Sequence, residues 1–115
     1  MTDNMQNVNV GDIFTAEWGY DETRVSFFQI LEKVGKKSVR VREVQPEMAG
    51  YNSFKINHGK ILPPSKYGSV FIKDNEKGDI KRLRFDFDQP SINLSKYVWA
   101  RKETRGVVVD DYSYW

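Results

Sequence analysis

The sequence predicts a mainly β protein, a single small antiparallel β-barrel or rolled sheet, with an SH3-like barrel as the first choice. Aromatic residues make up 14% of the 115-residue chain, and Thr, Val and Ile fill many of the gaps between them, a mixture that favours strands over helices. No window has a long apolar stripe at helical spacing, so an all-α fold is not expected. Instead, many short apolar runs alternate with turn residues, which is typical of small barrels.

The first 44 residues predict a three-stranded antiparallel meander. The apolar runs Ile13–Trp18 and Arg24–Val34 flank a short polar link, which is the pattern of a strand, a turn and a strand. The second run has apolar residues on both alternating faces, so it predicts a central strand. After a turn at residues 35–37, the run Ser38–Val44 alternates valine with arginine and predicts a half-exposed strand with a basic outer face.

The rest of the chain predicts further short strands. Residues 45–67 are broken repeatedly by Pro and Gly. The residues 75–78, Asn-Glu-Lys-Gly, predict a hairpin turn with its glycine at positive φ. We expect the remaining strands at 53–56, 60–62, 69–73, 79–88, 92–99 (with a turn at 94–95) and 107–109. In the strand 79–88, Leu83, Phe85 and Phe87 are expected to point inward.

The length of the chain predicts one domain. We expect a disordered or loosely attached lead at residues 1–9, a single β domain at 10–109 and an aromatic tail at 110–115. The lead has no basic cluster followed by an apolar core, so no signal peptide is expected. No apolar run approaches the ~18–20 residues of a membrane span. The expectation is a soluble, cytoplasmic protein with no membrane partner.

The sequence excludes several classes of catalysis. It has no cysteine, which removes disulfides, thiolate nucleophiles and cysteine metal sites. The only histidine, His58, lies in the region broken by Pro and Gly, where a solvated side chain is the expectation and a general base the alternative. No serine occupies a G-x-S-x-G elbow, and neither a phosphate-binding P-loop nor a G-x-G-x-x-G motif is present. We therefore expect no enzyme, no catalytic residue and no cofactor.

Acidic pairs are the remaining candidates for a metal site. Asp86 and Asp88 share one strand face, and with Asp110 and Asp111 they would offer four carboxylates to Mg²⁺ or Ca²⁺. The favoured alternative is that Asp86 and Asp88 end a strand and pair with nearby Arg or Lys, for about 0–1 kcal/mol when exposed. The acids at 21–22 are interpreted as turn residues. No metal site is expected.

The middle of the chain is basic, although the net charge is only +2. The first 32 residues hold one basic and six acidic side chains, and the next 52 hold thirteen basic and five acidic. Solvated surface charge is one interpretation, and a binding face is the other. If two of the predicted strands lie in one sheet, four guanidiniums line a surface that can hold phosphates. These are Arg40 and Arg42 on one strand, and Arg82 and Arg84 on the other.

Aromatic residues gather at two places outside the predicted core. Trp18 and Tyr20 bracket a glycine at the first turn, where they are candidates to stack on unpaired bases for about 1–3 kcal/mol each. Tyr112, Tyr114 and Trp115 crowd the C-terminus, together with the earlier Trp99. This tail either packs back on the barrel or docks into a partner, since Trp and Tyr are strong interface anchors.

Two stretches resemble a family of small uncharacterised proteins carried by bacteriophages, plasmids and integrative elements. The first reads G-D-I-F-x-x-x-W-G-Y-D-x-T-x-x-x-F-F-Q, followed by K-S-V-R-V-R-E-V, and the second closes the chain with Y-V-W-A-R-K-E-T-R-G-V-V-V-D-D-Y-S-Y-W. The resemblance covers the first forty or so residues and the last twenty. It implies a short cytosolic protein of a bacterial mobile element, often a regulator, a DNA-associated protein or an inhibitor of host defence.

We therefore expect a non-enzymatic protein that binds a macromolecule. The leading hypothesis is inhibition of a host defence nuclease, of anti-CRISPR or anti-restriction type, by occlusion, and the aromatic tail also makes a homodimer conceivable. The alternative is direct nucleic-acid binding by the basic sheet face. A third hypothesis is a small-molecule or nucleotide site lined by Trp18, Tyr20 and Phe28.

Overall fold

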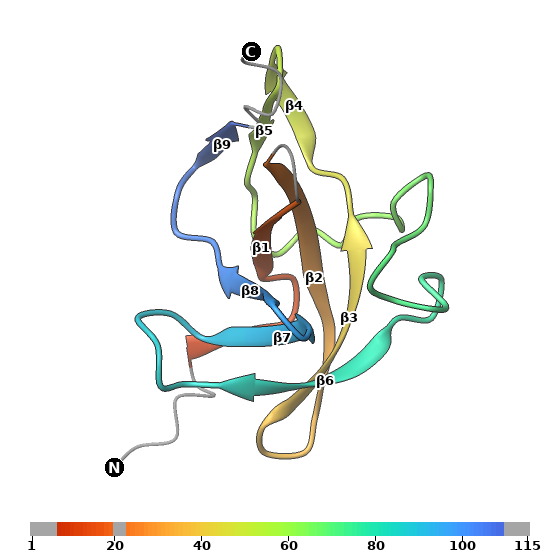
Figure 1. Ribbon diagram of the computed structural model, residues 1–115, viewed down its shortest axis with the longest axis vertical. Helices are drawn as coiled ribbons and strands as arrows, with labels where there is room; N and C mark the ends of the chain where they lie inside the picture. The colour runs from red at the N-terminus through yellow and green to blue at the C-terminus, as the bar shows by residue number, and fades with distance from the viewer. Residues whose placement is uncertain (1–6, 20–22, 110–115) are drawn as a thin grey trace.

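The computed structural model describes residues 7–19 and 23–109, and these form two antiparallel sheets (Figure 1). Six strands close into a barrel in the order β1-β2-β3-β6-β7-β8, and the other three form a sheet in the order β4-β5-β9. No α-helix occurs in the described residues. The strands are β1 (Ile13–Trp18), β2 (Arg24–Val34), β3 (Ser38–Val44), β4 (Glu47–Gly50), β5 (Ser53–Lys55), β6 (Asp79–Arg84), β7 (Ser91–Ser95), β8 (Val98–Lys102) and β9 (Val107–Val109).

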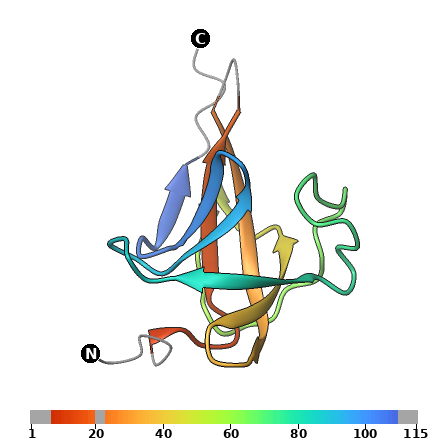
Figure 2. The ribbon, with the colours of Figure 1, turned by 60° about the horizontal axis from the view of Figure 1, so that its bottom comes forward.

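The predicted barrel is confirmed, and its small size and closed antiparallel sheet are consistent with an SH3-like barrel. The first three strands have the predicted bounds, and they pair as the predicted meander. Closure comes from a long-range pair, because β8 lies antiparallel to β1 and places Ala100 opposite Ala16. Figure 2 shows the segment between β5 and β6 looping out on one side of the barrel, with β9 on the other side.

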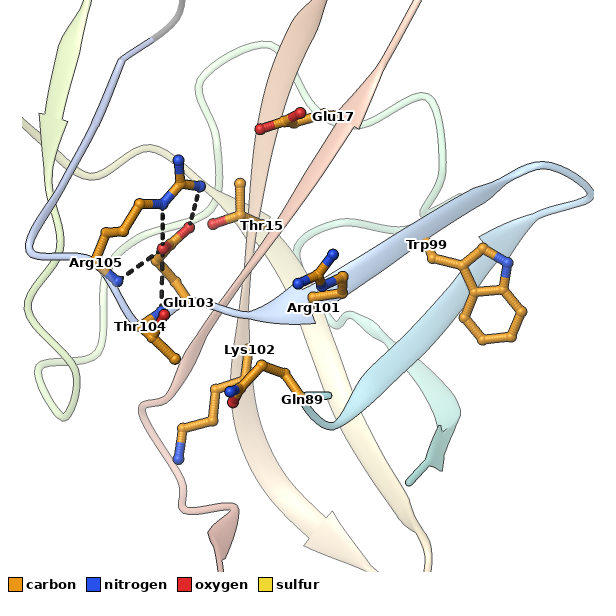
Figure 3. Close-up of a pocket in the computed structure, with 9 residues that line it drawn as sticks. All are labelled: Thr15, Glu17, Gln89, Trp99, Arg101, Lys102, Glu103, Thr104 and Arg105. Carbon is orange, nitrogen blue, oxygen red and sulfur yellow. Dashed lines mark hydrogen bonds and ion pairs between the residues drawn. The ribbon is translucent and has the colours of Figure 1, made fainter. Parts of the chain in front are cut away.

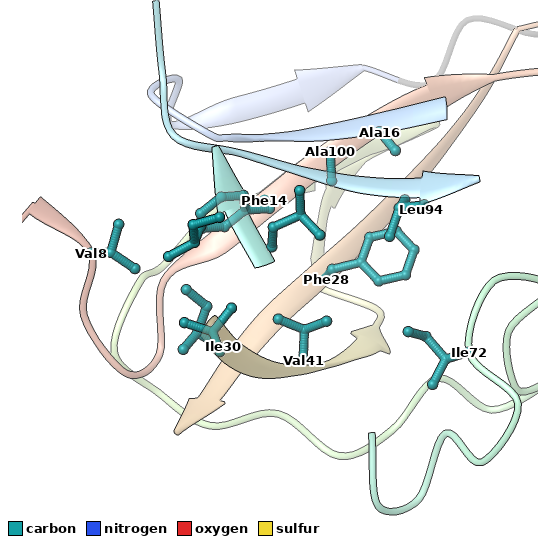
Figure 4. Packing of buried hydrophobic residues seen from close by; sticks show 12 residues of the cluster. Val8, Phe14, Ala16, Phe28, Ile30, Val41, Ile72, Leu94 and Ala100 are labelled. Carbon is teal, nitrogen blue, oxygen red and sulfur yellow. The ribbon is translucent and has the colours of Figure 1, made fainter. Parts of the chain in front are cut away.

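The central strand β2 packs against a separate core on each of its faces, as its sequence predicts. Phe28 and Ile30 point into the barrel, where both are fully buried (Figure 4). Phe27 points the other way and packs with Phe54 of β5 and Val108 of β9. The three-stranded sheet therefore covers the outer face of β1 and β2, and β2 contributes side chains to both cores.

Two of the predicted strands are absent, and side-chain hydrogen bonds replace them. Residues 60–62 are bound by the buried amide of Gln29, which accepts from Leu62 N at 2.9 Å and donates to Lys60 O at 2.7 Å. In residues 69–73, Ser69 Oγ accepts from the backbone amides of Phe71 and Ile72 at 3.1 and 3.2 Å, which bends the chain. Ile72 is thereby turned into the barrel core, where only 1% of it is exposed.

Other boundaries also differ from the prediction. Gly78 has the predicted positive φ of 82°, but its turn is not a hairpin because no strand precedes it. The predicted strand 79–88 ends at Arg84, and Phe87, predicted to point inward, is 49% exposed. The turn expected at 94–95 lies at 96–97, so the hairpin that contains it reaches Lys102. The edge strand β4 was not predicted, because all four of its residues are exposed and leave no alternating pattern.

The packed domain begins before the predicted boundary at residue 10. Val8 is fully buried in the barrel core. Asp12 then accepts from Asn9 N at 2.8 Å and pairs with Lys102 Nζ at 3.2 Å, which ties this segment to the end of β8. Within the described ranges, no helix has the length and apolar character needed to span a bilayer.

Candidate functional site

The two predicted arginine strands are neighbours in the barrel. β3 pairs with β6, with Ser38 opposite Arg82 and Arg40 opposite Ile80. The side chains of Val39, Val41 and Leu83 fill the barrel, so the arginines of both strands point outward. The two arginine strands therefore lie in one sheet, which is what a shared basic face requires.

Three of these four arginines, however, already have partners. Arg42 donates from Nη1 to Glu76 O at 3.0 Å and from Nη2 to Leu62 O at 2.8 Å, so it holds loop carbonyls in place. Arg40 pairs with Glu32 at 2.7 Å and Arg84 with Asp86 at 2.7 Å. Arg82 is exposed and has no ion-pair partner among the residues that the structure describes.

Trp18 does not form an exposed platform. Its indole N–H donates to Ser26 Oγ at 2.8 Å, and its ring meets Phe71 edge-on at a centroid distance of 5.1 Å. It is half-buried against the barrel core. The other aromatic candidates, Tyr20, Tyr112, Tyr114 and Trp115, and the acids at 21–22 and 110–111 lie outside the described residues.

A different tryptophan occupies the outer face of the barrel. Trp99 of β8 points away from the core because its neighbour Ala100 points inward and is fully buried. Phe87 meets its ring edge-on at 5.3 Å, and the guanidinium of Arg84 lies 6.0 Å from the ring centroid. Two neighbours in different elements therefore hold this half-buried ring in one orientation.

Arginines flank small residues next to this tryptophan. The strand registers place Arg84 opposite Ser91, Ser91 opposite Arg101, and Arg101 opposite Thr15, in one row across four strands. The hydroxyl residues are short, so they form the floor between the longer arginine side chains. We call the set Arg84, Phe87, Trp99 and Arg101 the Trp99 surface.

Two grooves meet at the Trp99 surface, and Trp99 and Arg101 line both. One, of about 470 Å³, is also lined by Asp86, Phe87, Asp88 and Ser91. The other, of about 430 Å³, runs from Trp99 past Arg101 and Thr15 to Glu103 and Arg105 (Figure 3).

The far end of the second groove is held by an internal ion pair. Glu103 is buried and accepts from Arg105 Nε at 2.8 Å, from Arg105 Nη2 at 3.0 Å, and from the backbone amides of Thr104 and Arg105 (Figure 3). Burial acts to raise the pKa of Glu103, but the hydrogen bonds from Arg105 outweigh it and lower the pKa to about 2. Glu103 is therefore a structural anion rather than an acid–base group.

The Trp99 surface carries charges of both signs. Beside its two arginines and Lys102 of the second groove, three acids line the two grooves, namely Glu17, Asp86 and Asp88. Arg84 and Asp86 neutralise each other, and Arg101 is exposed with no partner in the described part of the chain. This face is close to electrically neutral.

His58 is exposed, as the sequence predicts, but its ring is also bound to the backbone. Its Nδ1 accepts a hydrogen bond from Ile13 N at 2.9 Å, and its Nε2 lies 3.1 Å from Glu103 O. Because Nδ1 accepts, Nε2 carries the proton and donates. Both ring nitrogens serve backbone groups, which leaves His58 a structural role.

Metal-ligating residues do not gather within residues 7–19 and 23–109, where no three His, Asp or Glu side chains come together. Asp86 pairs with Arg84, which is the arrangement that the sequence favours for it.

Two residues of the Trp99 surface escaped the sequence-based prediction. The predicted strand ends at residue 99 and so leaves Arg101 out, and the predicted alternation places Phe87 in the core. The alternation of Trp99, Ala100 and Arg101 is the signal that could have found the first, once β8 is extended to Lys102.

Comparison of the chain with protein-family models, with curated proteins and with solved structures finds no match in any of the three. The resemblance to proteins of mobile elements therefore stays a prediction.

Proposed function

We propose that this is a non-enzymatic binding protein that docks onto a protein partner through the Trp99 surface. The observation that supports this most is the environment of Trp99, an outward tryptophan held by Phe87 and Arg84 and next to Arg101. Trp and Arg are the residues most enriched in interface hot spots. The balanced charge of the surface suits a protein partner better than a phosphate backbone, which requires excess positive charge.

The partner class follows from the resemblance of residues 11–29 to mobile-element proteins. In its sharpest form, the proposal is that the partner is a host defence nuclease of CRISPR or restriction type. A rigid barrel face that presents Trp99 and Arg101 would inhibit such an enzyme by occluding its nucleic-acid channel or another working surface.

The test compares capture by the wild-type protein, by a W99A/R101A variant and by R101A alone. Arg101 is exposed, so R101A keeps the fold even if W99A weakens it. Tyr51→Ala is the matched control, because Tyr51 is 88% exposed at the turn of the other sheet. We expect a protein from a bacterial host lysate to bind wild type and Y51A but not W99A/R101A, with or without nuclease treatment. Capture that survives both changes, or that disappears on nuclease treatment, contradicts the proposal.

Nucleic-acid binding is the second candidate, and a different part of the molecule favours it. The turn between β2 and β3 packs against β6, since Leu83 N donates to Lys37 O at 2.7 Å. This brings a set of basic residues to one end of the barrel. The nearby acid Glu32 pairs with Arg40, which is not a member of this set. The set, which we call the basic end, is Lys33, Lys36, Lys37, Lys81 and Arg82.

A salt titration distinguishes this candidate from the first. If the basic end binds phosphates, affinity for DNA or RNA falls steeply as salt rises, and K36E/K37E reduces both the affinity and the salt slope. W99A then has no effect on binding by the basic end. A protein that retards neither DNA nor RNA at low salt eliminates this candidate and leaves the first untouched.

A further inference from the structure

A third groove, which Trp18 helps to line, shares no lining residue with the Trp99 surface. It has a volume of about 620 Å³. Its apolar walls include Phe27, Phe54 and Trp18. The ring centroids of Phe27 and Phe54 lie 5.1 Å apart, and Trp18 packs against Phe71, which lies behind the lining, at the same centroid distance. Tyr67 also lines the groove and is 87% exposed.

One carboxyl group, that of Glu43, lines this groove. The backbone of Glu43 is fixed by the side chain of Asn75, which accepts from Glu43 N at 2.8 Å and donates to Glu43 O at 2.9 Å. Ser65 N donates to the same carbonyl at 2.8 Å. The fold therefore fixes the backbone from which the Glu43 side chain reaches the groove.

Two serines connect this carboxyl group to the groove wall. The hydroxyl groups of Ser26 and Ser69 act on the Glu43 carboxyl and lower its pKa. Ser26 Oγ already accepts from the Trp18 indole, and Ser69 Oγ accepts from the amides of Phe71 and Ile72. Each hydroxyl therefore keeps its one proton for another acceptor, and donation to the Glu43 carboxylate accounts for the lowering of its pKa. The indole of Trp18 is thus linked to Glu43 through one hydroxyl.

The hydrogen bonding of Glu43 is incomplete. Its Oε1 is buried and has no hydrogen-bond partner within the described residues. A buried acceptor left in this state destabilises a folded protein. Burial accordingly raises the pKa of Glu43, and the serine hydroxyls only partly oppose it. A donor that enters the groove would recover the missing interaction.

The geometry selects the kind of donor. One unpaired oxygen accepts a single strong hydrogen bond, whereas a guanidinium needs two oxygens for its fork. An ammonium binds one oxygen as a compact point charge and leaves its other N–H groups to water at the open side of the groove, while its alkyl stem packs along apolar walls such as those of Phe27 and Phe54. The terminal torsion of a glutamate is broad, so a small turn of the carboxyl presents Oε1 to the groove. Arg24, the other charged lining residue, lies at the exposed start of β2.

We propose that this groove binds a lysine side chain of a partner protein, with the ammonium donating to Glu43 and the stem lying between Phe54 and Trp18. The site is independent of the Trp99 surface, and it does not require that the proposed function be correct.

The probe is the tripeptide acetyl-Gly-Lys-Gly-amide, titrated into the ¹⁵N-labelled protein. The Trp18 indole N–H is a built-in reporter because it connects to Glu43 through Ser26, and W18F assigns its signal. We expect saturable shifts of the Trp18 indole signal and none of the Trp99 indole signal. The norleucine peptide, which keeps the stem and lacks the charge, should give no saturable shift, and the arginine peptide should bind more weakly.

The matched variants are E43Q and E47Q. E43Q keeps the shape and an acceptor for the serines but removes the charge, so we expect about a tenfold loss of affinity, the value of one charge-assisted hydrogen bond. E47Q alters an exposed glutamate of β4 and should bind as wild type does. The proposal is overturned if the lysine and norleucine peptides bind equally, if E43Q binds as tightly as wild type, or if the Trp18 signal does not move. Tighter binding of the arginine peptide would overturn the choice of an ammonium.

Discussion

His58 and Ile13 are joined by a hydrogen bond of 2.9 Å in which the imidazole Nδ1 accepts from the backbone N–H at the start of β1. Ile13 is 1% exposed, so this N–H has no access to water. The opposite ring nitrogen, Nε2, reaches Glu103 O at 3.1 Å, just past the end of β8. One loop histidine therefore fastens the two strands that close the barrel.

The first prediction is that H58A destabilises the protein by about 1–3 kcal/mol, the usual cost of leaving a buried backbone donor unpaired. Urea unfolding followed by tryptophan fluorescence measures it. N57A is the control, because Asn57 is the exposed neighbour of His58. If H58A and N57A unfold at the same urea concentration, the histidine does not have the structural role assigned to it.

The second prediction concerns Glu103, whose pKa of about 2 lies below its ordinary value of 4.5. Since the folded state holds this proton less tightly than the unfolded state, the stabilising contribution is present above pH 4.5 and is lost as pH falls toward 2. We expect E103Q to unfold at a lower temperature than wild type at pH 7, and the difference to shrink between pH 4.5 and 2.

Thermal unfolding at a series of pH values measures this effect, with E17Q as the control. Glu17 is exposed and lies in the same groove. A gap between wild type and E103Q that stays constant down to pH 2 would show that packing, rather than the ion pair with Arg105, is responsible.

The third prediction concerns Glu43, whose pKa is shifted in the direction opposite to that of Glu103. Burial raises the pKa of Glu43 above 4.5, so the folded state disfavours its charged form. The resulting destabilisation is absent below pH 4.5 and is complete once pH exceeds the raised pKa. E43Q should therefore unfold at a higher temperature than wild type at pH 7, with the gain fading toward pH 4. Differential scanning calorimetry measures it, and a lower melting temperature for E43Q at pH 7 contradicts the assignment.

The strands of the first 44 residues could be predicted because their own side chains carry the pattern. β2 has large apolar residues on both faces, and the structure places a core on each of them. The segments 60–62 and 69–73 could not be predicted, because their backbone groups bind side chains rather than a neighbouring strand. Gln29 lies about thirty residues before Leu62, and nothing in a local window indicates that its amide replaces a strand partner.

The same limit applies to the candidate site. The sequence predicts outward arginines at 40, 42, 82 and 84, and β3 and β6 do lie side by side. It does not predict that Arg42 is held by two loop carbonyls, since those belong to Leu62 and Glu76. The row that joins Arg101 to Thr15 depends on barrel closure between the first and eighth strands, a register that no local pattern contains.

The last prediction separates two glycines that both have positive φ. A Cβ on Gly11, at φ +96°, would lie 2.5 Å from the Cα of Gly59, whereas a Cβ on Gly35, at φ +70°, would meet nothing within 4 Å. G35A should therefore cost only the strain of a left-handed backbone, about 1–2 kcal/mol.

G11A adds a backbone clash at the point where Gly59 N donates to Gly11 O at 3.0 Å, beside the ring of His58. We expect G11A to lose clearly more stability than G35A in urea unfolding, and to weaken amide-exchange protection at Gly59 and Ile13, which G35A leaves unchanged. Equal losses for the two variants would mean that residues 57–60 can move away from β1 at little cost, and that the contact between Gly11 and Gly59 does not hold the barrel closed.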